Sequence, residues 1–448
     1  MRHFNYLLLA VLVLAIASCN RPIRYDLIVE NASIFDTQTG EVSNGKTILV
    51  NDGIIVGIIN SNEPVRTKKV VDADGRLVIP GLIDTHASFE KSIYSTHKNA
   101  NNHPKTLTTF YRNLYSRNYL PYGVTMALDM GTDSLWISQI INWKPNPKFA
   151  DLLVSLNTSQ LSKLKPDDFT SKVQSVIDTP IQYIYIDNCL EPQKEKLLKQ
   201  KAEQKNIIVF EKTDCQLCSL EESKNIEYII SPILYIFNKC GDKTVVAKQI
   251  ENVYGKQTKL PPSIYALEVF KYIVENNPAL LDTIVSSINT HSGSISTNLH
   301  SMAGYCDLTH FKSEIDRNKI DLPNELKHRI EYNFNHLLSF VKKLHDSGIS
   351  LRIGTNSDNG GLAFVSEQML LADAGISASE IIKISTINAA KTLGIEKLYG
   401  SIEIGKKADL IIYDQNPLED PKNFASTRRV IKSGKLFKRN MAKIDIDE

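Results

Sequence analysis

Apolar residues form short extended runs near both ends of the chain. Residues 47–50 and 54–58 are two such runs, and an Asn-Asp-Gly turn at 51–53 lies between them. Two apolar runs joined by a turn of this kind predict a β-hairpin. Near the other end, residues 408–413 and 435–437 are also strand-like. Neither end could bury a core alone, so we expect the two ends to pack together as one β-sandwich.

The middle of the chain alternates between two apolar patterns. Residues 326–345 and 377–393 carry apolar side chains at helical spacing, and Ser377 with Glu380 forms a capping box at the start of the second stretch. Short strand-like runs lie between such stretches. This alternation predicts a parallel α/β sheet. The strand-like runs are residues 125–128, 151–155, 183–186, 207–210, 228–230 and 349–353.

One strand-like run ends in polar side chains. Residues 77–83 are apolar apart from a kink at the Pro-Gly pair, and Asp84, Thr85 and His86 follow directly. In a parallel barrel, the ends at which the strands emerge carry the chemistry. A polar turn with a structural histidine would give the same pattern, so these residues alone leave both interpretations open.

The composition is that of an ordinary globular protein. Charged residues make up 23% of the 448 residues, and the net charge is +2. This balance carries no signal for nucleic-acid binding, and we expect no nucleic-acid partner. Length alone would suggest several domains, but α/β barrels often exceed about 250 residues as one domain.

The N-terminal segment is typical of an export signal. Arg2 and His3 precede an apolar run over residues 7–17, which is shorter than the roughly 20 residues that a membrane-spanning helix needs. The Ile-Ala-Ser-Cys sequence at 16–19 resembles a bacterial lipobox. The resemblance implies cleavage before Cys19, diacylation of its sulfur, and anchoring to a membrane of the cell envelope. A plain signal peptide with an incidental cysteine is the alternative.

Export would place the mature chain in a compartment that permits disulfides. Five cysteines remain after Cys19, and an odd number leaves at least one without an intramolecular partner. Cys215 and Cys218 have the spacing of a metal or redox pair, although a disulfide or two thiols would fit as well. The other three are Cys189, Cys240 and Cys306.

Pro-Gly-Leu-Ile-Asp-Thr-His at residues 80–86 resembles the first barrel strand of the amidohydrolase superfamily, in its imidazolonepropionase-like branch. Later stretches resemble the same family in the same order, namely residues 354–358, 385–390, 400–410 and 416–418. The resemblance implies an α/β fold, a distorted (β/α)8 TIM barrel with a small composite β-sandwich domain built from both chain ends. The implied domains are a lipoprotein signal peptide at 1–19, the two sandwich parts at 20–75 and 401–448, and the barrel at 76–400.

Proteins of this family attack a carbon–nitrogen bond with a metal-bound hydroxide, because a bound divalent cation lowers the pKa of water from 15.7 to about 7. The ligands come from the ends of strands one, four, five, six and eight, and the last-strand Asp takes the proton of the water. By this resemblance, His86 is the only metal ligand that the chain retains. The sequence has no histidine between His103 and His291 that could replace the lost ligands. The residues at the other positions are Ser88, Tyr185, Phe210, Ser231 and Asn356.

These replacements indicate a degenerate metal site and an impaired enzyme. Phe210 brings an apolar ring where an imidazole stood, and the uncharged amide of Asn356 cannot act as a base. Too few nitrogen and carboxylate ligands remain for zinc. We therefore expect no bound cofactor, and a barrel mouth that binds a neutral or weakly polar small molecule or a protein partner.

Two alternatives remain open. A working hydrolase of cyclic amides or dipeptides could hold zinc or another divalent metal on carboxylates, with Asp358 as its catalytic group beside Asn356. The chain could instead be a structural subunit that pairs with an active paralogue in an oligomer. The carboxylates available for a metal are Glu211, Asp358, Asp84 and Asp129. The pocket in each case is formed by His86, Ser88, Tyr185, Phe210, Glu211, Ser231 and Asn356.

Overall fold

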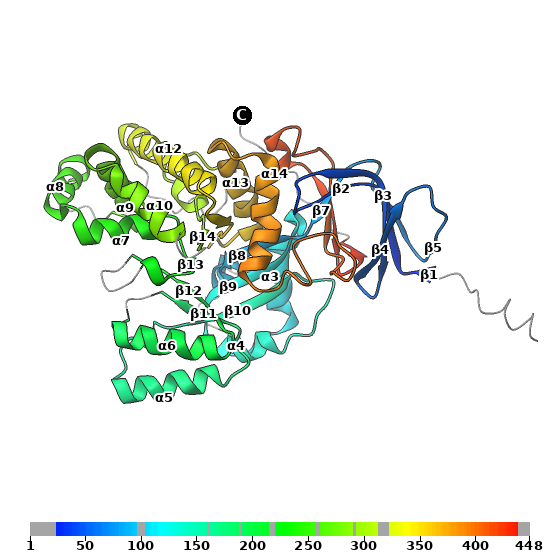
Figure 1. Cartoon of the computed structure of the whole chain (residues 1–448), viewed down its shortest axis with the longest axis horizontal. Helices are drawn as coiled ribbons and strands as arrows, with labels where there is room; N and C mark the ends of the chain where they lie inside the picture. Colours follow the sequence, from blue (N-terminus) through cyan, green and yellow to red (C-terminus); the bar gives the residue numbers. More distant parts are fainter. Residues whose placement is uncertain are drawn as a thin grey trace, which may run out of the picture.

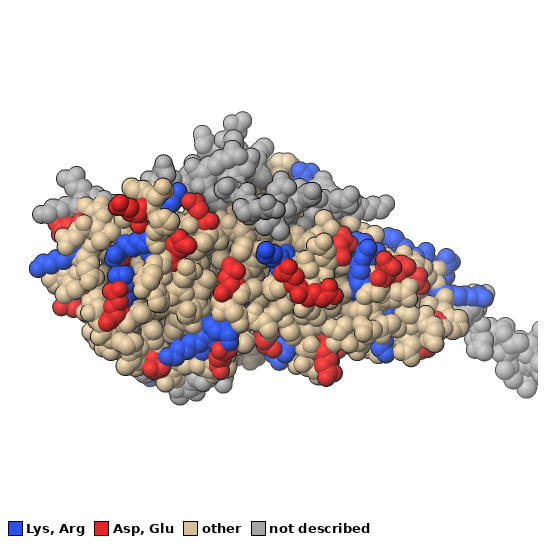
Figure 2. Space-filling model, turned by 90° about the horizontal axis from the view of Figure 1, so that it is seen from above, with Lys and Arg blue, Asp and Glu red and all other residues tan. Residues whose placement is uncertain are grey.

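The computed structural model describes residues 24–95, 104–159, 161–187, 190–214, 220–255, 260–289, 293–311 and 322–437. The expectations for Cys19, Cys189, Cys215 and Cys218 concern residues outside these ranges. A barrel and a smaller sheet lie next to each other along the long axis of the molecule (Figure 1). On the face shown in Figure 2, the Lys and Arg side chains of the described residues are interspersed with Asp and Glu side chains.

Eight parallel strands form the barrel. Each pairs with the next in chain order from β8 to β15, and hydrogen bonds from Thr85 N to Ile353 O (3.0 Å) and from Thr355 N to His86 O (3.1 Å) join the last strand to the first. The predicted (β/α)8 barrel is therefore confirmed. The strands are β8 (Leu82–Ala87), β9 (Val124–Thr132), β10 (Asp151–Asn157), β11 (Tyr183–Ile186), β12 (Ile208–Glu211), β13 (Asn225–Ile226), β14 (Ser294–Ser296) and β15 (Ser350–Arg352).

Helices cover the outside of the barrel (Figure 1). The barrel is distorted because four helices, α7 (Ser231–Cys240), α8 (Lys243–Tyr254), α9 (Pro262–Asn276) and α10 (Ala279–Asn289), lie between β13 and β14 in the chain. None of the described helices is long and apolar enough to cross a membrane. The others that bear on the site are α2 (Phe89–Ser95), α3 (Thr109–Tyr119), α4 (Ser134–Ile141), α5 (Pro166–Ile177), α6 (Pro192–Gln204), α11 (His300–Ala303), α12 (Asn324–Asp346) and α13 (Gly360–Asp373).

The helix predicted from residue 377 is divided into three parts. The Ser377 hydroxyl accepts a hydrogen bond from Glu380 N (3.3 Å) and caps α14 (Ala378–Lys383), as the capping box predicts. A π-helical turn, Ile384–Asn388, follows, and α15 (Ala389–Thr392) completes the segment. A π-helical turn holds one residue more than an α-helical turn. The side chains after it therefore face a different direction than they would in a continuous α-helix.

Both chain ends contribute to the smaller sheet, as expected. Strand β16 (Leu410–Tyr413) from the C-terminal part lies between β7 (Leu77–Pro80) and β17 (Arg428–Lys432). The sheet is one connected layer, and a bridge joins Ile54 in its edge strand β4 to Lys407, just before β16, so that the sheet curves around an apolar core. Its remaining strands are β2 (Leu27–Phe35), β3 (Val42–Asn51), β4 (Ile54–Asn60), β6 (Val70–Asp72) and β18 (Lys435–Leu436).

The Pro80-Gly81 pair is where the chain passes from one domain to the other. The sequence predicts one kinked strand here, but the structure has two strands, with β7 in the smaller sheet and β8 in the barrel. A Cβ atom on Gly81 would lie 2.2 Å from the Thr125 hydroxyl, so no side chain fits at the crossing. The first barrel strand consequently begins at Leu82, and the segment before it belongs to the smaller sheet.

Candidate functional site

His86 lies near the C-terminal end of β8, where the barrel opens. Its side chain is 3% exposed, and its Nδ1 atom lies 2.5 Å from Glu227 Oε2. A Cβ atom on Gly354 would lie 2.6 Å from the His86 Cβ, so only glycine fits beside His86 at this position.

Glu227, directly after β13, is held between two partners. Arg352 Nη2 donates a hydrogen bond to Glu227 Oε1 at 2.5 Å, and both side chains are completely buried. Burial alone would raise the pKa of Glu227, but the charge of Arg352 and the hydrogen bonds from His86 and Arg352 hold it below its usual range. The Glu227 carboxylate is therefore ionised at neutral pH.

Arg352 fills the interior of the barrel beneath His86. Its guanidinium donates to Thr85 Oγ1 (3.0 Å) and Ser294 Oγ (3.2 Å), as well as to the carbonyl of Ile226 (3.0 Å). The carbon of the guanidinium lies 5.0 Å from the centroid of the Phe210 ring, which is a cation–π distance. A fixed positive charge thus occupies the space between β8, β12, β13 and β14.

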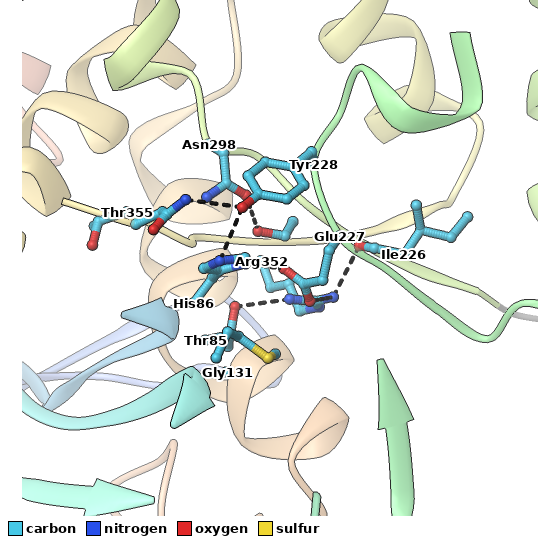
Figure 3. A network of polar contacts seen from close by, with 12 residues as sticks. Thr85, His86, Gly131, Ile226, Glu227, Tyr228, Asn298, Arg352 and Thr355 are labelled. Carbon is cyan, nitrogen blue, oxygen red and sulfur yellow. Dashed lines mark hydrogen bonds and ion pairs between the residues drawn. The ribbon is translucent and has the colours of Figure 1, made fainter. Parts of the chain in front are cut away.

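Tyr228 covers the other nitrogen of His86 (Figure 3). Its hydroxyl lies 3.3 Å from His86 Nε2 and 2.8 Å from Asn356 Nδ2. Lys91 Nζ lies 2.9 Å from Asn356 Oδ1. An ammonium group can only donate, so the amide oxygen of Asn356 must face Lys91 and the amide nitrogen must face Tyr228.

The orientation of the Asn356 amide fixes the direction of the hydrogen bonds that run from Asn356 through Tyr228 and His86 to Glu227. Tyr228 accepts from Asn356, so its own proton is directed at His86 Nε2. His86 then carries its proton on Nδ1 and donates it to Glu227. Both nitrogens of the imidazole are engaged by protein groups.

Three neighbouring strand ends turn through left-handed backbone conformations above His86. The φ angles are 67° at Tyr228, 49° at Asn298 and 45° at Asn356. Asparagine adopts this region readily, but a tyrosine there is an outlier that costs on the order of 1–3 kcal/mol. Such strain concentrates where the placement of a side chain matters.

The structure brings only some of the expected site residues together. The ring centroid of Tyr185 lies 5.8 Å from that of His86, Phe210 lies under Arg352, and Asn356 N donates to His86 O (2.7 Å). Ser88 instead caps α2, because its hydroxyl accepts from Lys91 N at 3.3 Å.

Ser231 does not stand at the sixth-strand position. It lies in the first turn of α7, where its hydroxyl donates to Glu227 O at 2.6 Å. The position beside His86 belongs to Tyr228, which directly follows the Ile226-Glu227 pair. In the family that the sequence resembles, the sixth-strand histidine also follows an Ile-Glu pair. The Ile226-Glu227 pair could therefore have identified Tyr228 as the residue at this position. Sequence reasoning also missed Glu227 and Arg352 as site residues.

The carboxylates considered for an alternative metal site are engaged separately. Glu211 pairs with Lys199 (2.8 Å), Asp84 accepts from the Thr355 hydroxyl (2.5 Å), and Asp129 accepts from Phe89 N (2.8 Å). Asp358 accepts from Asn359 N at 2.8 Å. Burial raises the pKa of both Asp84 and Asp129 to about 6. Within the described ranges, no group of three or more His, Cys, Asp and Glu residues is placed to hold a metal ion.

The side chains at the family's metal position do not fit a zinc ion. The lone pair of His86 Nε2 faces the Tyr228 hydroxyl, and the nearest carboxylate, Glu227, is neutralised by a buried guanidinium. A dication would have to displace the hydroxyl and approach Arg352 without an anionic partner of its own. Zinc sites instead offer imidazole, thiolate and carboxylate ligands around an open position.

The α/β barrel carries a small sheet built from both chain ends, and several strand-end residues gather at its mouth. The model of the amidohydrolase family matches residues 285–437 of the chain. Ochratoxinase from Aspergillus niger is 35% identical over 96 residues, which is 20% of this chain and 20% of the relative. The match thus spans about a fifth of the length of that curated relative.

Solved structures share the fold over nearly the whole chain. A putative prolidase from Bifidobacterium longum has a TM-score of 0.61 at 19% identity and covers 95% of this chain and 97% of its own. An adenosine deaminase from Xanthomonas campestris, solved with bound zinc, has a TM-score of 0.55 at 13% identity and covers 95% and 96%. At these identities, the likeness concerns the fold.

Proposed function

We propose that this chain is an amidohydrolase-fold protein that has lost metal-dependent hydrolysis and binds a small molecule at the mouth of its barrel. One observation carries the proposal: Nε2 of His86, the only family ligand retained, faces the Tyr228 hydroxyl at 3.3 Å. This hydroxyl takes the place that a metal would need. The contact of Nδ1 with Glu227 orients the ring and is equally usual behind metal-bound histidines, so it carries no weight in the proposal.

The charges of the site support the same proposal. Hydrolysis through a metal-bound hydroxide needs a base near the water. Asn356 stands where the family has its Asp, and its amide is committed to Tyr228 and Lys91. Asp358 bonds to Asn359 N, two residues further along a turn. Glu227, the carboxylate that contacts His86, is committed to Arg352 and to Nδ1 of the imidazole, so it is not free to take a proton from water.

Metal content tests this proposal. We expect purified protein to contain far less than one equivalent of zinc after dialysis against zinc, measured by inductively coupled plasma mass spectrometry. It should show no chelator-sensitive hydrolysis of cyclic amides or dipeptides. The matched control is the triple variant Ser88→His, Tyr228→His and Asn356→Asp, which restores three family residues and should bind more zinc. Near one equivalent in the unaltered protein, together with chelator-sensitive hydrolysis, would overturn the proposal.

We further propose that a lipid on Cys19 anchors the protein in the cell envelope. The support is the lipobox-like sequence at 16–19 and the need for more than one acyl chain for stable anchoring, which diacylation supplies. A Cys19→Ser variant should move from the membrane fraction to the soluble fraction on cell fractionation. Unchanged membrane association would contradict this assignment.

A further inference from the structure

The side-chain amide of Asn298, just after β14, is buried with an unused donor. Asn298 is 3% exposed, and its Oδ1 accepts a hydrogen bond from the Ser296 hydroxyl. Its Nδ2 has no hydrogen-bond partner among the residues that the structure describes. Buried amide groups nearly always have a partner, because an unmet donor loses its hydration without compensation.

This amide lies at the mouth of the barrel beside His86 and Tyr228 (Figure 3). A Cβ atom on Gly354 would lie 3.2 Å from Asn298 Oδ1 and 2.6 Å from the His86 Cβ, so Gly354 allows the two residues to approach each other. The backbone of Asn298 is left-handed (φ 49°), and its side chain lies next to Tyr228 (Figure 3). The unused donor is therefore part of the same site as the His86 network.

A second donor stands at the open side of the site. Lys91 Nζ donates to the backbone oxygen and to Oδ1 of Asn356, both at 2.9 Å. An ammonium group has three donors, so one remains for a further acceptor. Asp358 and Glu90 act on the same ammonium group electrostatically. The mouth therefore carries donors without the excess positive charge that a polyanion such as phosphate would need.

We propose that the barrel mouth binds an sp² oxygen of a small organic ligand, a carboxylate or an amide carbonyl, through Asn298 Nδ2 and Lys91 Nζ. This rests on the proposed function, because a metal at His86 would itself take such an oxygen. Asn298 supplies the fixed, buried donor, and Lys91 supplies the exposed, adjustable one. The Tyr228 ring, which lies 4.9 Å from the His86 ring between centroids, forms an apolar wall for the rest of the ligand.

Three probes of one shape test the chemistry: benzoate, benzamide and benzyl alcohol. Their affinities are measured for the full chain in the presence of a chelator, by ligand-observed nuclear magnetic resonance titration. We expect benzoate or benzamide to bind at least about fivefold more tightly than benzyl alcohol, which is the ratio that one hydrogen bond supplies. Equal affinities for all three probes, or no binding of any, would overturn the proposal.

The variant Asn298→Asp replaces the donor by an acceptor and tolerates the left-handed backbone. It should weaken benzoate binding by at least about fivefold. Asn206→Asp is the matched control, since Asn206 is also left-handed (φ 55°) but precedes β12, at the opposite end of the barrel strands from the site. If Asn298→Asp lowers the melting temperature, Asn298→Gly replaces it and should show the same loss. Unchanged benzoate binding in these variants would contradict the assignment of Asn298 as a ligand-binding residue.

The chelator separates this inference from the proposed function. Binding that a chelator abolishes would mean that a metal holds the ligand, and the proposed function would fail with it. Binding that withstands the chelator but ignores Asn298 would leave the proposed function intact and overturn the Asn298 assignment alone.

Discussion

Two buried clusters of charged residues are built alike but lie at different places in the fold. At the centre of the barrel, Glu227 lies between Arg352 and His86. Where the barrel meets the smaller sheet, Lys432 lies between Asp151 (2.6 Å) and Asp409 (2.7 Å). In each cluster, one ion is held by two partners, and the strength of the arrangement depends on burial.

The two clusters differ in what surrounds them. Asp151 begins a barrel strand, whereas Asp409 and Lys432 belong to the smaller sheet, so this cluster joins the two domains. Burial alone would lower the pKa of Lys432, but Asp409 and Asp151 hold it above its usual range. The barrel cluster instead occupies the place where the fold presents its reactive groups. The contacts within the two clusters are alike, so position in the fold is what distinguishes them.

Breaking the barrel cluster should give the largest loss of stability. An Arg352→Met variant leaves the carboxylate of Glu227 buried with only His86 beside it, and we expect a loss of about 3–5 kcal/mol in the free energy of unfolding. Urea titration measures the loss. The double variant Arg352→Met with Glu227→Gln removes the stranded charge and should recover part of it.

Lys432→Met is the control from the other cluster. The Asp151 side chain is 22% exposed and can be hydrated when its partner is lost. The Asp409 side chain is only 4% exposed, but it keeps a hydrogen bond from Ser433 N (2.7 Å). The loss should therefore be smaller, about 2–3 kcal/mol. Equal losses at the two sites would contradict the difference in burial that separates the clusters.

The fold could be predicted well from the sequence because its signals are local. The turn at 51–53 and the Ser377 cap each specify structure within a few residues, and both are found as expected. The pairing of the two chain ends followed from their shared inability to bury a core. The division at Gly81 was missed, because a kink within a strand and a passage between two sheets have the same local sequence.

The site was harder to predict because its bonds join distant residues. Glu227 and Arg352 are 125 positions apart in the chain, and only the order of the barrel strands brings them together. Arg352 did leave a trace, since it is the one charged residue in the apolar run at 349–353. A charge in a buried strand needs a buried partner, but nothing local identifies Glu227 as that partner.

Glu367 on α13 should make the folded protein less stable as the pH rises. Burial raises its pKa to about 8, against hydrogen bonds from Thr297 Oγ1 and His300 N, both at 2.6 Å. In the unfolded chain, a glutamate loses its proton near pH 4.3, roughly. Between about pH 4 and pH 8, the folded state therefore binds more protons, and stability falls as pH rises.

A Glu367→Gln variant tests this sign. The amide keeps the neutral shape, so the variant should lose much of the fall in stability between pH 5 and pH 8 and be more stable at pH 8 by about 1–2 kcal/mol. Thermal denaturation across this range measures the difference. Asp84 and Asp129 act in the same direction near pH 6 and should leave a residual slope. A variant whose stability falls as steeply as that of the unaltered protein would show that Glu367 is not the group that titrates.

Substitutions of Ser88 should have the smallest effect on stability, and they test directly whether the barrel site can hold a metal. It stands where the family has its second histidine ligand, yet its hydroxyl accepts from Lys91 N and its backbone oxygen accepts from the Ser92 hydroxyl (2.8 Å). A Ser88→Ala variant should lose only about 0.5–1 kcal/mol, the worth of a helix cap. A Ser88→His variant should lose a similar amount and still bind no zinc, because Tyr228 keeps its contact with His86 Nε2. Stoichiometric zinc in that single variant would mean that one residue separates this site from a working metal centre, and that the His86 network yields readily to a metal.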